Sequence, residues 1–403
     1  MPTSEPVNAC PARGGRSSTA EALAFPFALP DEPLSLPAVY ATLRTSRPVC
    51  RIRLPTGALA WLVTTWEDAR VVLSDPRFSK AAMTAPDAPK ARPGALPPGV
   101  LFTTDPPEHT ALRALLSRGL TGQRVAALRP RMIACADALI SALVAPADLV
   151  SGFAEPFAMR VICDLLGVPS DDQARFAAWS ATVLAVDSTS ALEVEVAQRE
   201  LLGYIAGLVA AKCRAPGDDV VSDLLRASTP DDHQRVVGLV ATLLVTGYET
   251  MVAAVANAVL TLLAVNGSIV VELTPTLLEE LFRFSGFGDA LRSRRAVADV
   301  VLGDVVVRAG DLVMVSTASA NRDAAVFVDA DSFVPGRCPN PHVGFGRGVH
   351  YCAGAGLSRT QLHVALSRLA VLVPGLRLAA PLEEIRLRGG ASESPPERLL
   401  VAW

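Results

Sequence analysis

The chain has 403 residues, half of them apolar, and a formal net charge of −3 with a pI of about 6.0. Its length and apolar content allow a large buried core in one or two domains, while its charge argues against a basic surface for nucleic acid. The seven cysteines are scattered, without the Cys-x-x-Cys spacing of zinc or redox sites, which fits a reducing cytoplasm.

The first 22 residues are polar and lack the apolar core of a signal peptide or a membrane anchor. We therefore expect residues 1–22 to form a flexible N-terminal tail and residues 23–403 to form the folded part of the protein. No Pro/Ser-rich linker divides the interior of the sequence, so we expect one large domain without a membrane anchor.

The first predicted elements are short. A helix-like stretch at 38–44 precedes two β-type runs at 49–54 and 60–64, and a Pro-Thr-Gly turn signal joins these runs into a hairpin. Seven prolines fall in 84–108, which is too many for regular structure, so this segment is predicted to be a loop.

A helical block follows. Apolar residues recur with helical periodicity in five segments, namely 112–120, 124–144, 153–166, 171–186 and 192–214. The next stretch, 236–265, is almost wholly apolar and, at about 1.5 Å per residue, long enough to cross a bilayer. Glu249 lies near its middle, and the sequence has neither a second such span nor a flanking Lys/Arg cluster. The pattern therefore predicts a helix that is buried all round in a large soluble protein.

The last third of the chain mixes both element types. It contains a predicted helix at 274–284, a hairpin at 297–309 with Gly303-Asp304 at its tip, and a helix at 355–373. The order of elements is thus β-rich, then helical, then mixed.

Directly before that last helix, Cys352 is framed by glycines at 344, 346, 348 and 354. A metal-bound thiolate needs positive partial charge directed at its sulfur, and free backbone N–H groups and a helix N-terminus supply it. Glycines allow the tight turns and the close approach that such a loop requires. A buried structural cysteine is the alternative, and the glycine spacing, together with the neighbouring Phe345 and His350, argues against it.

The pattern Phe345-x-x-Gly348-x-x-x-Cys352-x-Gly354 resembles the haem-binding loop of the cytochrome P-450 family. The resemblance implies a mainly α-helical fold with small β-sheets, in which heme b lies between the long central helix and the cysteine-loop helix. It also implies that Cys352 ligates the haem iron, that Phe345 packs beneath the porphyrin and that His350 lies near a propionate.

Cationic residues elsewhere match the family's propionate ligands. His109 and Arg113 are four residues apart on one face of a predicted helix, a spacing that by itself favours a solvated face. They gain weight because Asp105-Pro-Pro-Glu-His109-Thr-x-Leu-Arg113 matches the family's pattern. Arg294 corresponds to a further propionate ligand, with Arg295 as the alternative assignment.

Glu280 and Arg283 form a Glu-x-x-Arg pair, which in most helices is a modest surface ion pair. The resemblance implies a different role, in which this pair and Arg337 form a buried structural triad that fixes the core around the cysteine loop. Breaking such a triad would leave an unpaired buried charge.

The sequence Thr246-Gly247-Tyr248-Glu249-Thr250 in the long helix resembles the family's Ala-Gly-x-(Asp/Glu)-Thr. The resemblance implies that Thr250 takes part in dioxygen activation and that Glu249 supplies protons through water. A helix able to fill with Leu and Val has no packing reason to bury a Glu. This chain departs from the pattern at Thr246, which adds a hydroxyl to the pocket, and after Thr250, where Met replaces a common Thr or Ser.

The activity implied by the resemblance is that of a haem-thiolate monooxygenase that uses O2 to hydroxylate or otherwise oxidise a lipophilic small molecule in bacterial secondary metabolism. Electrons would come from NAD(P)H through a ferredoxin and a ferredoxin reductase, because no Gly-x-Gly-x-x-Gly nucleotide motif follows a strand. We expect a cytoplasmic monomer. By analogy with the family, the substrate pocket would include Leu101, Phe102, Leu243, Thr246, Gly247 and Leu291.

Three other functions stay open at this point. The same chemistry can serve oxidative C–C coupling of an aromatic or cyclic-peptide substrate. A haem-thiolate sensor or electron carrier would need Cys352 but not Glu249 and Thr250. A structural helical protein without a metal would need none of the three.

Overall fold

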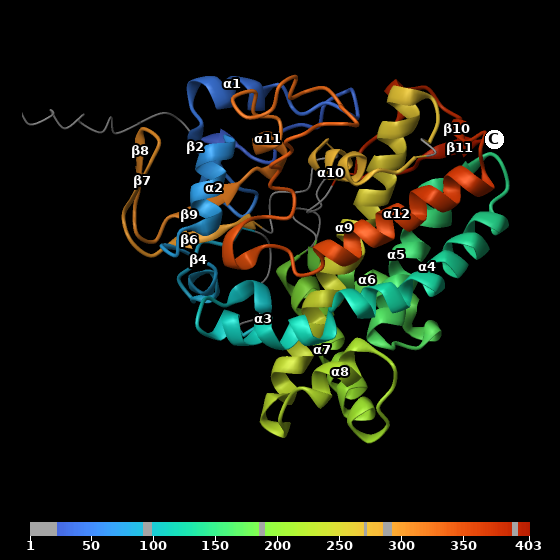
Figure 1. The fold of residues 1–403 in the computed structure, drawn as a ribbon. Helices are drawn as coiled ribbons and strands as arrows, with labels where there is room; N and C mark the ends of the chain where they lie inside the picture. Colours follow the sequence, from blue (N-terminus) through green and yellow to red (C-terminus); the bar gives the residue numbers. More distant parts are fainter. Residues whose placement is uncertain (1–21, 92–98, 185–189, 270–271, 285–291, 389–393) are drawn as a thin grey trace, which may run out of the picture.

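The computed structural model describes residues 22–91, 99–184, 190–269, 272–284, 292–388 and 394–403. Helices dominate these residues, and the largest sheet lies at one side of the molecule (Figure 1). The α-helices are α1 Val39–Ser46, α2 Trp66–Ser74, α3 Glu108–Gly119, α4 Gly122–Ala142, α5 Glu155–Leu166, α6 Gln173–Leu184, α7 Ala191–Arg214, α8 Val220–Arg226, α9 His233–Asn266, α10 Pro275–Phe284, α11 Thr317–Ala320 and α12 Ala355–Leu372.

The largest sheet joins strands that are far apart in the sequence. Alternate side chains of its central strands enter different core clusters, Ala60 and Leu62 on one face and Trp61 and Val63 on the other. Both faces are therefore buried, which explains the nearly continuous apolar runs. Its strand order is β1 Leu23–Ala24, β2 Val49–Arg53, β3 Leu59–Val63, β9 Leu312–Val315, β6 Arg294–Ala296 and β4 Phe78–Ser79.

Two smaller sheets complete the strands of the described residues. One joins β10 Arg377–Leu378, β11 Leu400–Ala402 and β5 Ala147–Asp148, so the C-terminal segment is paired with the middle of the chain. The other is the hairpin of β7 Val300–Leu302 and β8 Val305–Val307.

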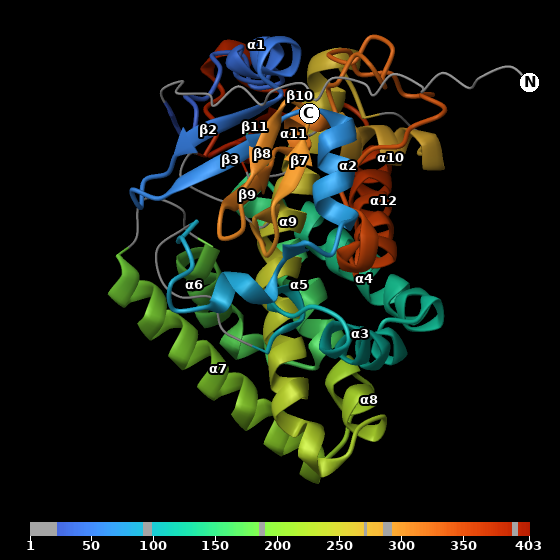
Figure 2. The same ribbon diagram turned by 90° about the vertical axis from the view of Figure 1, so that its left-hand side faces the viewer.

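The long helix α9 runs through the helical part of the molecule, where α5, α6, α7 and α12 pack against it (Figure 1, Figure 2). It ends at Gly267, whose left-handed φ of 71° forms the C-cap. By length and composition α9 could cross a membrane, but 78% of its most apolar stretch is buried inside the protein. The prediction of an all-round buried helix at 236–265 is thus confirmed.

The predicted fold class, mainly α with small sheets, is confirmed. The hairpin of 49–54 and 60–64 is the antiparallel pair β2–β3, and the hairpin of 297–309 is β7–β8. The five helices of the central block correspond to α3 through α7, and the later two to α10 and α12.

The differences concern short or irregular pieces. The helices α2, α8 and α11 were not predicted, because nine, seven and four residues are too few for a helical period to stand out. The described part of the Pro-rich segment 84–108 contains a 3-10 turn, Leu101–Thr103, and its last residue already belongs to α3. The helix expected at 153–166 is entered through a π-helical turn, Val150–Ala154.

Candidate active site

The cysteine loop folds back on itself in front of α12. The N–H of Cys352 donates to the carbonyl of Phe345 at 2.9 Å, and Gly346 and Gly348 both adopt a φ of +71°. Gly348 also lies against the end of α2, where a Cβ would come within 2.7 Å of the Leu73 carbonyl oxygen. Position 348 therefore requires glycine both for its backbone conformation and for this close approach.

Two opposing effects act on the partly buried Cys352 sulfur, and on balance they favour the neutral thiol. Burial raises the pKa of the Cys352 thiol, whereas the N–H of Gly354 and the charges of Arg113, Arg292 and Arg359 act in the opposite direction. Gly354 is the N-cap residue of α12, so the positive end of the helix dipole lies beside the sulfur. A metal cation bound at this sulfur would offset the effect of burial and keep the thiolate.

A cavity of about 240 Å³ brings the cysteine loop together with α9. The helix α9 contributes a strip of its surface, namely Thr242, Leu243, Thr246, Gly247, Thr250, Met251 and Ala254. The cysteine loop and α12 contribute Gly344, Phe345, Gly346, His350, Tyr351, Cys352, Ala353, Gly354, Leu357, Ser358 and Gln361. Apolar side chains from other elements complete the lining, namely Leu73, Leu101, Phe102, Leu116, Ile162 and Phe282.

Two histidines in the cavity lining are in contact with each other. The ring centroids of His109 and His350 are 4.2 Å apart. The Nε2 atom of each ring is buried and has no hydrogen-bond partner among the described residues. The Asp105 carboxylate is 3.8 Å from the His350 Nε2 atom, which is too far for a direct hydrogen bond. Two such orphaned polar atoms indicate that a polar group binds between the described side chains.

The electrostatics of these imidazoles follow from burial. Burial, with help from the charges of His350 and Arg113, lowers the pKa of His109 to about 4. Burial also lowers the pKa of His350, against the attraction of Asp105. His109 is therefore neutral near pH 7 and offers one ring N–H as a donor.

Arg294 lies in the cavity lining and Arg295 does not. The Arg294 side chain is only 3% exposed, and burial lowers its pKa to about 10. Arg295 points to the opposite side of β6, where its Nη2 atom is 2.6 Å from Asp87. The geometry therefore favours Arg294 for the role that the sequence left open between the two.

Sequence reasoning missed two further cations of the lining, Lys80 and Arg292. Arg292 donates to the carbonyl of Gly344 in the cysteine loop at 2.9 Å. Its signal was the Arg-x-Arg spacing, because residues two apart in extended chain share a side. Lys80 directly follows β4, and only the long-range pairing of β4 with β6 brings it to the site.

These residues fit a group that carries carboxylates and a metal. One thiol donor, Cys352, and six cationic or imidazole groups line the same cavity, namely Lys80, His109, Arg113, Arg292, Arg294 and His350. Guanidinium, ammonium and imidazole N–H groups are the donors that carboxylates prefer. The orphaned imidazole nitrogens leave room for such partners. The donor set thus matches haem, with its iron and two propionates, as implied by the sequence.

Thr250 and Glu249 are adjacent in α9 but face different surroundings. Thr250 lines the cavity, and its hydroxyl donates to the Thr246 carbonyl at 2.6 Å. Glu249 is 8% exposed and is not among the lining residues. Burial raises the pKa of Glu249, while Arg388 lowers it and Glu155 raises it further. The two latter residues form an ion pair of 3.1 Å, so Glu249 lies beside a charged pair that sequence reasoning missed.

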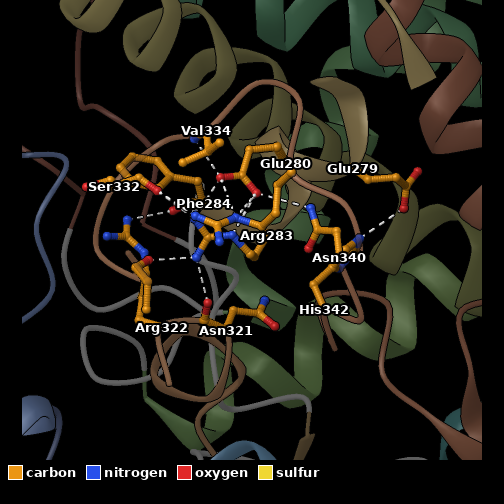
Figure 3. Close-up of polar contacts among 12 residues, drawn as sticks. Glu279, Glu280, Arg283, Phe284, Asn321, Arg322, Ser332, Val334, Asn340 and His342 are labelled. Atoms are coloured by element: carbon orange, nitrogen blue, oxygen red, sulfur yellow. Dashed lines mark hydrogen bonds and ion pairs between the residues drawn. The ribbon is translucent and has the colours of Figure 1, made fainter. Parts of the chain in front are cut away.

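Glu280, Arg283 and Arg337 are in direct contact and buried in the core. Figure 3 shows Glu280 and Arg283 side by side, with Val334 and Asn340 next to the carboxylate. The Arg283 Nε atom is 2.7 Å and the Arg337 Nε atom 3.0 Å from the Glu280 carboxylate. Glu280 also accepts from the N–H of Val334 and from the Asn340 side chain. Hydrogen bonds outweigh the effect of burial and lower the pKa of Glu280.

Apart from the structural triad, the structure thus gathers most of the predicted site residues around one cavity, and three are exceptions. Gly348 shapes the loop from behind, against α2. Glu249 lies beneath the cavity surface of α9, beside Arg388. Leu291, predicted to line the substrate pocket, lies outside the described residues.

Comparison with protein families gives one match. The family model described as cytochrome P-450 matches residues 269–370, a range that includes Glu280, Arg283 and the cysteine loop. Among curated relatives, a mycinamicin IV hydroxylase/epoxidase of Micromonospora griseorubida is 40% identical over 96% of this chain and its own full length. A nocardicin C N-oxygenase of Nocardia uniformis subsp. tsuyamanensis is 42% identical over 94% of this chain and 98% of its own.

Solved structures agree with these relatives. The mixed-function P-450 MycG matches with a TM-score of 0.81 and 39% identity, over 95% of this chain and all of the other. A crystal structure of HinD with NMFT and NO matches with a TM-score of 0.87 and 38% identity, over 96% of this chain and all of the other.

Proposed function

This chain belongs to the cytochrome P-450 family, and from that premise we propose which of its residues hold the haem, deliver protons and bind the substrate. As a member of the family it is an oxidoreductase, a haem-dependent monooxygenase that uses O2 and electrons from NAD(P)H supplied by redox partners. Its relatives place it among the monooxygenases of bacterial secondary metabolism. Catalysis, rather than sensing or a purely structural role, is therefore its function.

We assign the haem contacts to the groups that surround the cavity. Cys352 would ligate the iron, and Phe345 would pack against the porphyrin from the cysteine-loop side. His109, Arg113, Arg294 and His350, with Lys80 and Arg292, would hold the propionates. When bound, the haem supplies the oxygen chemistry, and the electron-donating thiolate favours cleavage of the O–O bond. The observation that carries this assignment is the thiol and the two orphaned imidazole nitrogens in one cavity.

Arg294 and Arg295 offer a matched test of the propionate assignment. Arg294→Gln should weaken haem binding by roughly 10- to 100-fold, because a charge-assisted hydrogen bond in a buried site is lost. Arg295→Gln removes a pair with the exposed Asp87 and a hydrogen bond to the Gly310 carbonyl, neither of which lines the cavity, and should leave haem binding unchanged. Haem transfer from each variant to apomyoglobin measures the difference. Equal transfer rates for both variants would contradict the assignment.

We assign proton delivery to Glu249 and Thr250. Glu249 is buried with a raised pKa, so it holds and releases a proton more readily near neutral pH than an exposed Glu. The ion pair of Arg388 and Glu155 lies next to it and is partly exposed, which connects the buried carboxyl to solvent. Thr250 lines the cavity and follows Glu249 directly in α9. Water ordered at the Thr250 hydroxyl would complete the path.

Glu249→Gln should lower the rate of product formation by about 100-fold or more, because it removes the acid without changing shape. It should not lower stability. The folded state binds the Glu249 proton more tightly than the unfolded state, because the folded-state pKa is raised. The protonated carboxyl therefore contributes to the stability of the protein below the ordinary pKa of Glu, and this contribution is lost as the pH rises through the folded-state pKa. Product formation and urea unfolding at pH 7 measure both effects. The exposed Glu195→Gln serves as a control. If Glu249→Gln loses product formation only together with a matching loss in the free energy of unfolding, Glu249 is merely structural.

We further propose that the substrate is a lipophilic natural product, that hydroxylation is the reaction and that a ferredoxin and its reductase supply electrons in the cytoplasm to a monomeric enzyme. Apolar lining residues such as Leu101, Phe102 and Leu243 support the choice of substrate. Oxidative C–C coupling is the alternative outcome of the same oxidant. Screening natural products for the low- to high-spin Soret shift, then adding ferredoxin, reductase and NADPH, identifies substrate and product. A shift without product under these conditions would contradict the proposed reaction.

A further inference from the structure

Three threonines follow one another along the cavity face of α9. Thr242, Thr246 and Thr250 are spaced four residues apart, and all three line the cavity. Residues at this spacing lie on one side of a helix, and each is about one helical turn from the next. The cavity surface of α9 therefore carries a row of hydroxyl groups in an otherwise apolar strip.

Each of these hydroxyls donates a hydrogen bond to a backbone carbonyl of α9. Thr242 donates to the Gly238 carbonyl at 2.8 Å, Thr246 to the Thr242 carbonyl at 2.7 Å, and Thr250 to the Thr246 carbonyl at 2.6 Å. A hydroxyl has one proton and two lone pairs, so each oxygen can only accept a further hydrogen bond. Toward the cavity, the row is thus a line of acceptors.

The other polar groups of the lining belong to a different part of it. Three of the groups that would bind a cofactor contact the cysteine loop: Arg113 donates to Tyr351, Arg292 donates to Gly344, and the His109 ring lies against His350. Around the threonines, α9 and its neighbours contribute apolar side chains, including Leu243, Ile162 and Phe102. In such surroundings the free lone pairs of these hydroxyls find a partner only when the bound molecule supplies a donor, and that hydrogen bond would tighten its binding roughly fivefold, which is about 1 kcal/mol.

We propose that Thr242 and Thr246 select a substrate that carries a hydroxyl or amine N–H donor on an apolar skeleton. The inference rests on the proposed function, in that the cavity is the substrate site. Thr250 is not part of this proposal, because it is assigned to proton delivery above. A molecule whose donor is methylated keeps its apolar contacts but leaves the threonine oxygens unpaired, so it binds less well.

The same helix provides a matched control. Thr261 is completely buried and donates to the Asn257 carbonyl at 2.7 Å, but it does not line the cavity. Its hydroxyl makes the same backbone bond as those of the row. Thr261→Val therefore reports what the loss of such a bond does to α9 alone.

The test uses the haem-loaded enzyme and pairs of substituted phenylimidazoles, followed by the Soret shift on binding. One member of each pair carries a hydroxyl or amino group at the ortho, meta or para position, and the other carries its methylated form. We expect the donor-bearing member to bind roughly fivefold more tightly in at least one pair. Thr242→Val or Thr246→Val should remove that preference, whereas Thr246→Ser and Thr261→Val should keep it.

Equal affinities within every pair in the unchanged protein would overturn the inference. A preference that survives in the Thr242→Val, Thr246→Val double variant would do so as well, because the acceptor would then lie elsewhere. Failure of the proposed function has a different signature. In that case unsubstituted phenylimidazole produces no Soret shift in any variant, including the unchanged protein.

Discussion

Replacing Cys352 by serine should abolish the red-shifted Soret band of the reduced, CO-bound protein and reduce turnover below detection. Among the described cysteines only Cys352 lines the cavity, so no other thiolate can take its place. Serine keeps the size of the side chain and the Cys352 backbone bond to Phe345, so the loop should keep its shape. What is lost is the soft, electron-donating ligand that a thiolate alone supplies.

The control for this variant is Cys213→Ser, an exposed cysteine on α7. It should retain the band and the activity, which separates the effect of the ligand from that of thiol loss in general. An unchanged CO spectrum in Cys352→Ser would show that the cysteine loop does not hold the iron. Haem content measured on the same samples distinguishes a changed ligand from an empty protein.

The cysteine loop could be predicted from the sequence because its determinants are local. Two glycines with left-handed φ, a cysteine and a helix start all fall between residues 346 and 355. The close contact of Gly348 with Leu73 could not be predicted, since it depends on how α2 packs against the loop. Local backbone requirements leave a pattern in the sequence, and tertiary contacts leave none.

The cationic part of the site was only partly predictable for the same reason. His109 and Arg113 share a helix and have a recognisable spacing. Lys80 reaches the cavity through the pairing of β4 with β6, two strands more than 200 residues apart in sequence. Arg388 reaches Glu155 over a separation of 233 residues. Such pairings follow from the topology of the whole chain, which no single segment specifies.

Glu249 shows the limit of reading adjacent residues as one unit. Neighbours on an α-helix are about 100° apart around its axis, so a residue next to Thr250 need not share its face. The structure places Thr250 in the cavity lining and Glu249 beside Arg388. The environment of the Glu249 carboxyl is therefore set by α5 and the C-terminal segment, through Glu155 and Arg388, rather than by the cavity.

Replacing Glu280 by glutamine should destabilise the haem-loaded protein by about 3–5 kcal/mol. The substitution keeps the shape but leaves Arg283, which is completely buried, and Arg337, which is 8% exposed, without their counter-charge. Measured against a typical free energy of unfolding of about 5–15 kcal/mol, this is a large fraction. Urea unfolding of the haem-loaded protein, followed by the Soret band and by circular dichroism, measures the change.

The neighbouring Glu279→Gln is the matched control, because Glu279 lies on the same helix and also pairs with an arginine, Arg359, but in a partly exposed position. Its effect should be smaller, about 1 kcal/mol or less. The pH dependence of the free energy of unfolding gives a second test of the role of Glu280. Since the folded-state pKa of Glu280 is lowered, its contribution is complete above the ordinary Glu value of 4.5 and is lost as the pH falls through the folded value. The unchanged protein should therefore lose stability on acidification more steeply than Glu280→Gln. Parallel acid profiles, or a Glu280→Gln variant as stable as Glu279→Gln, would show that the triad does not hold the core around the cysteine loop.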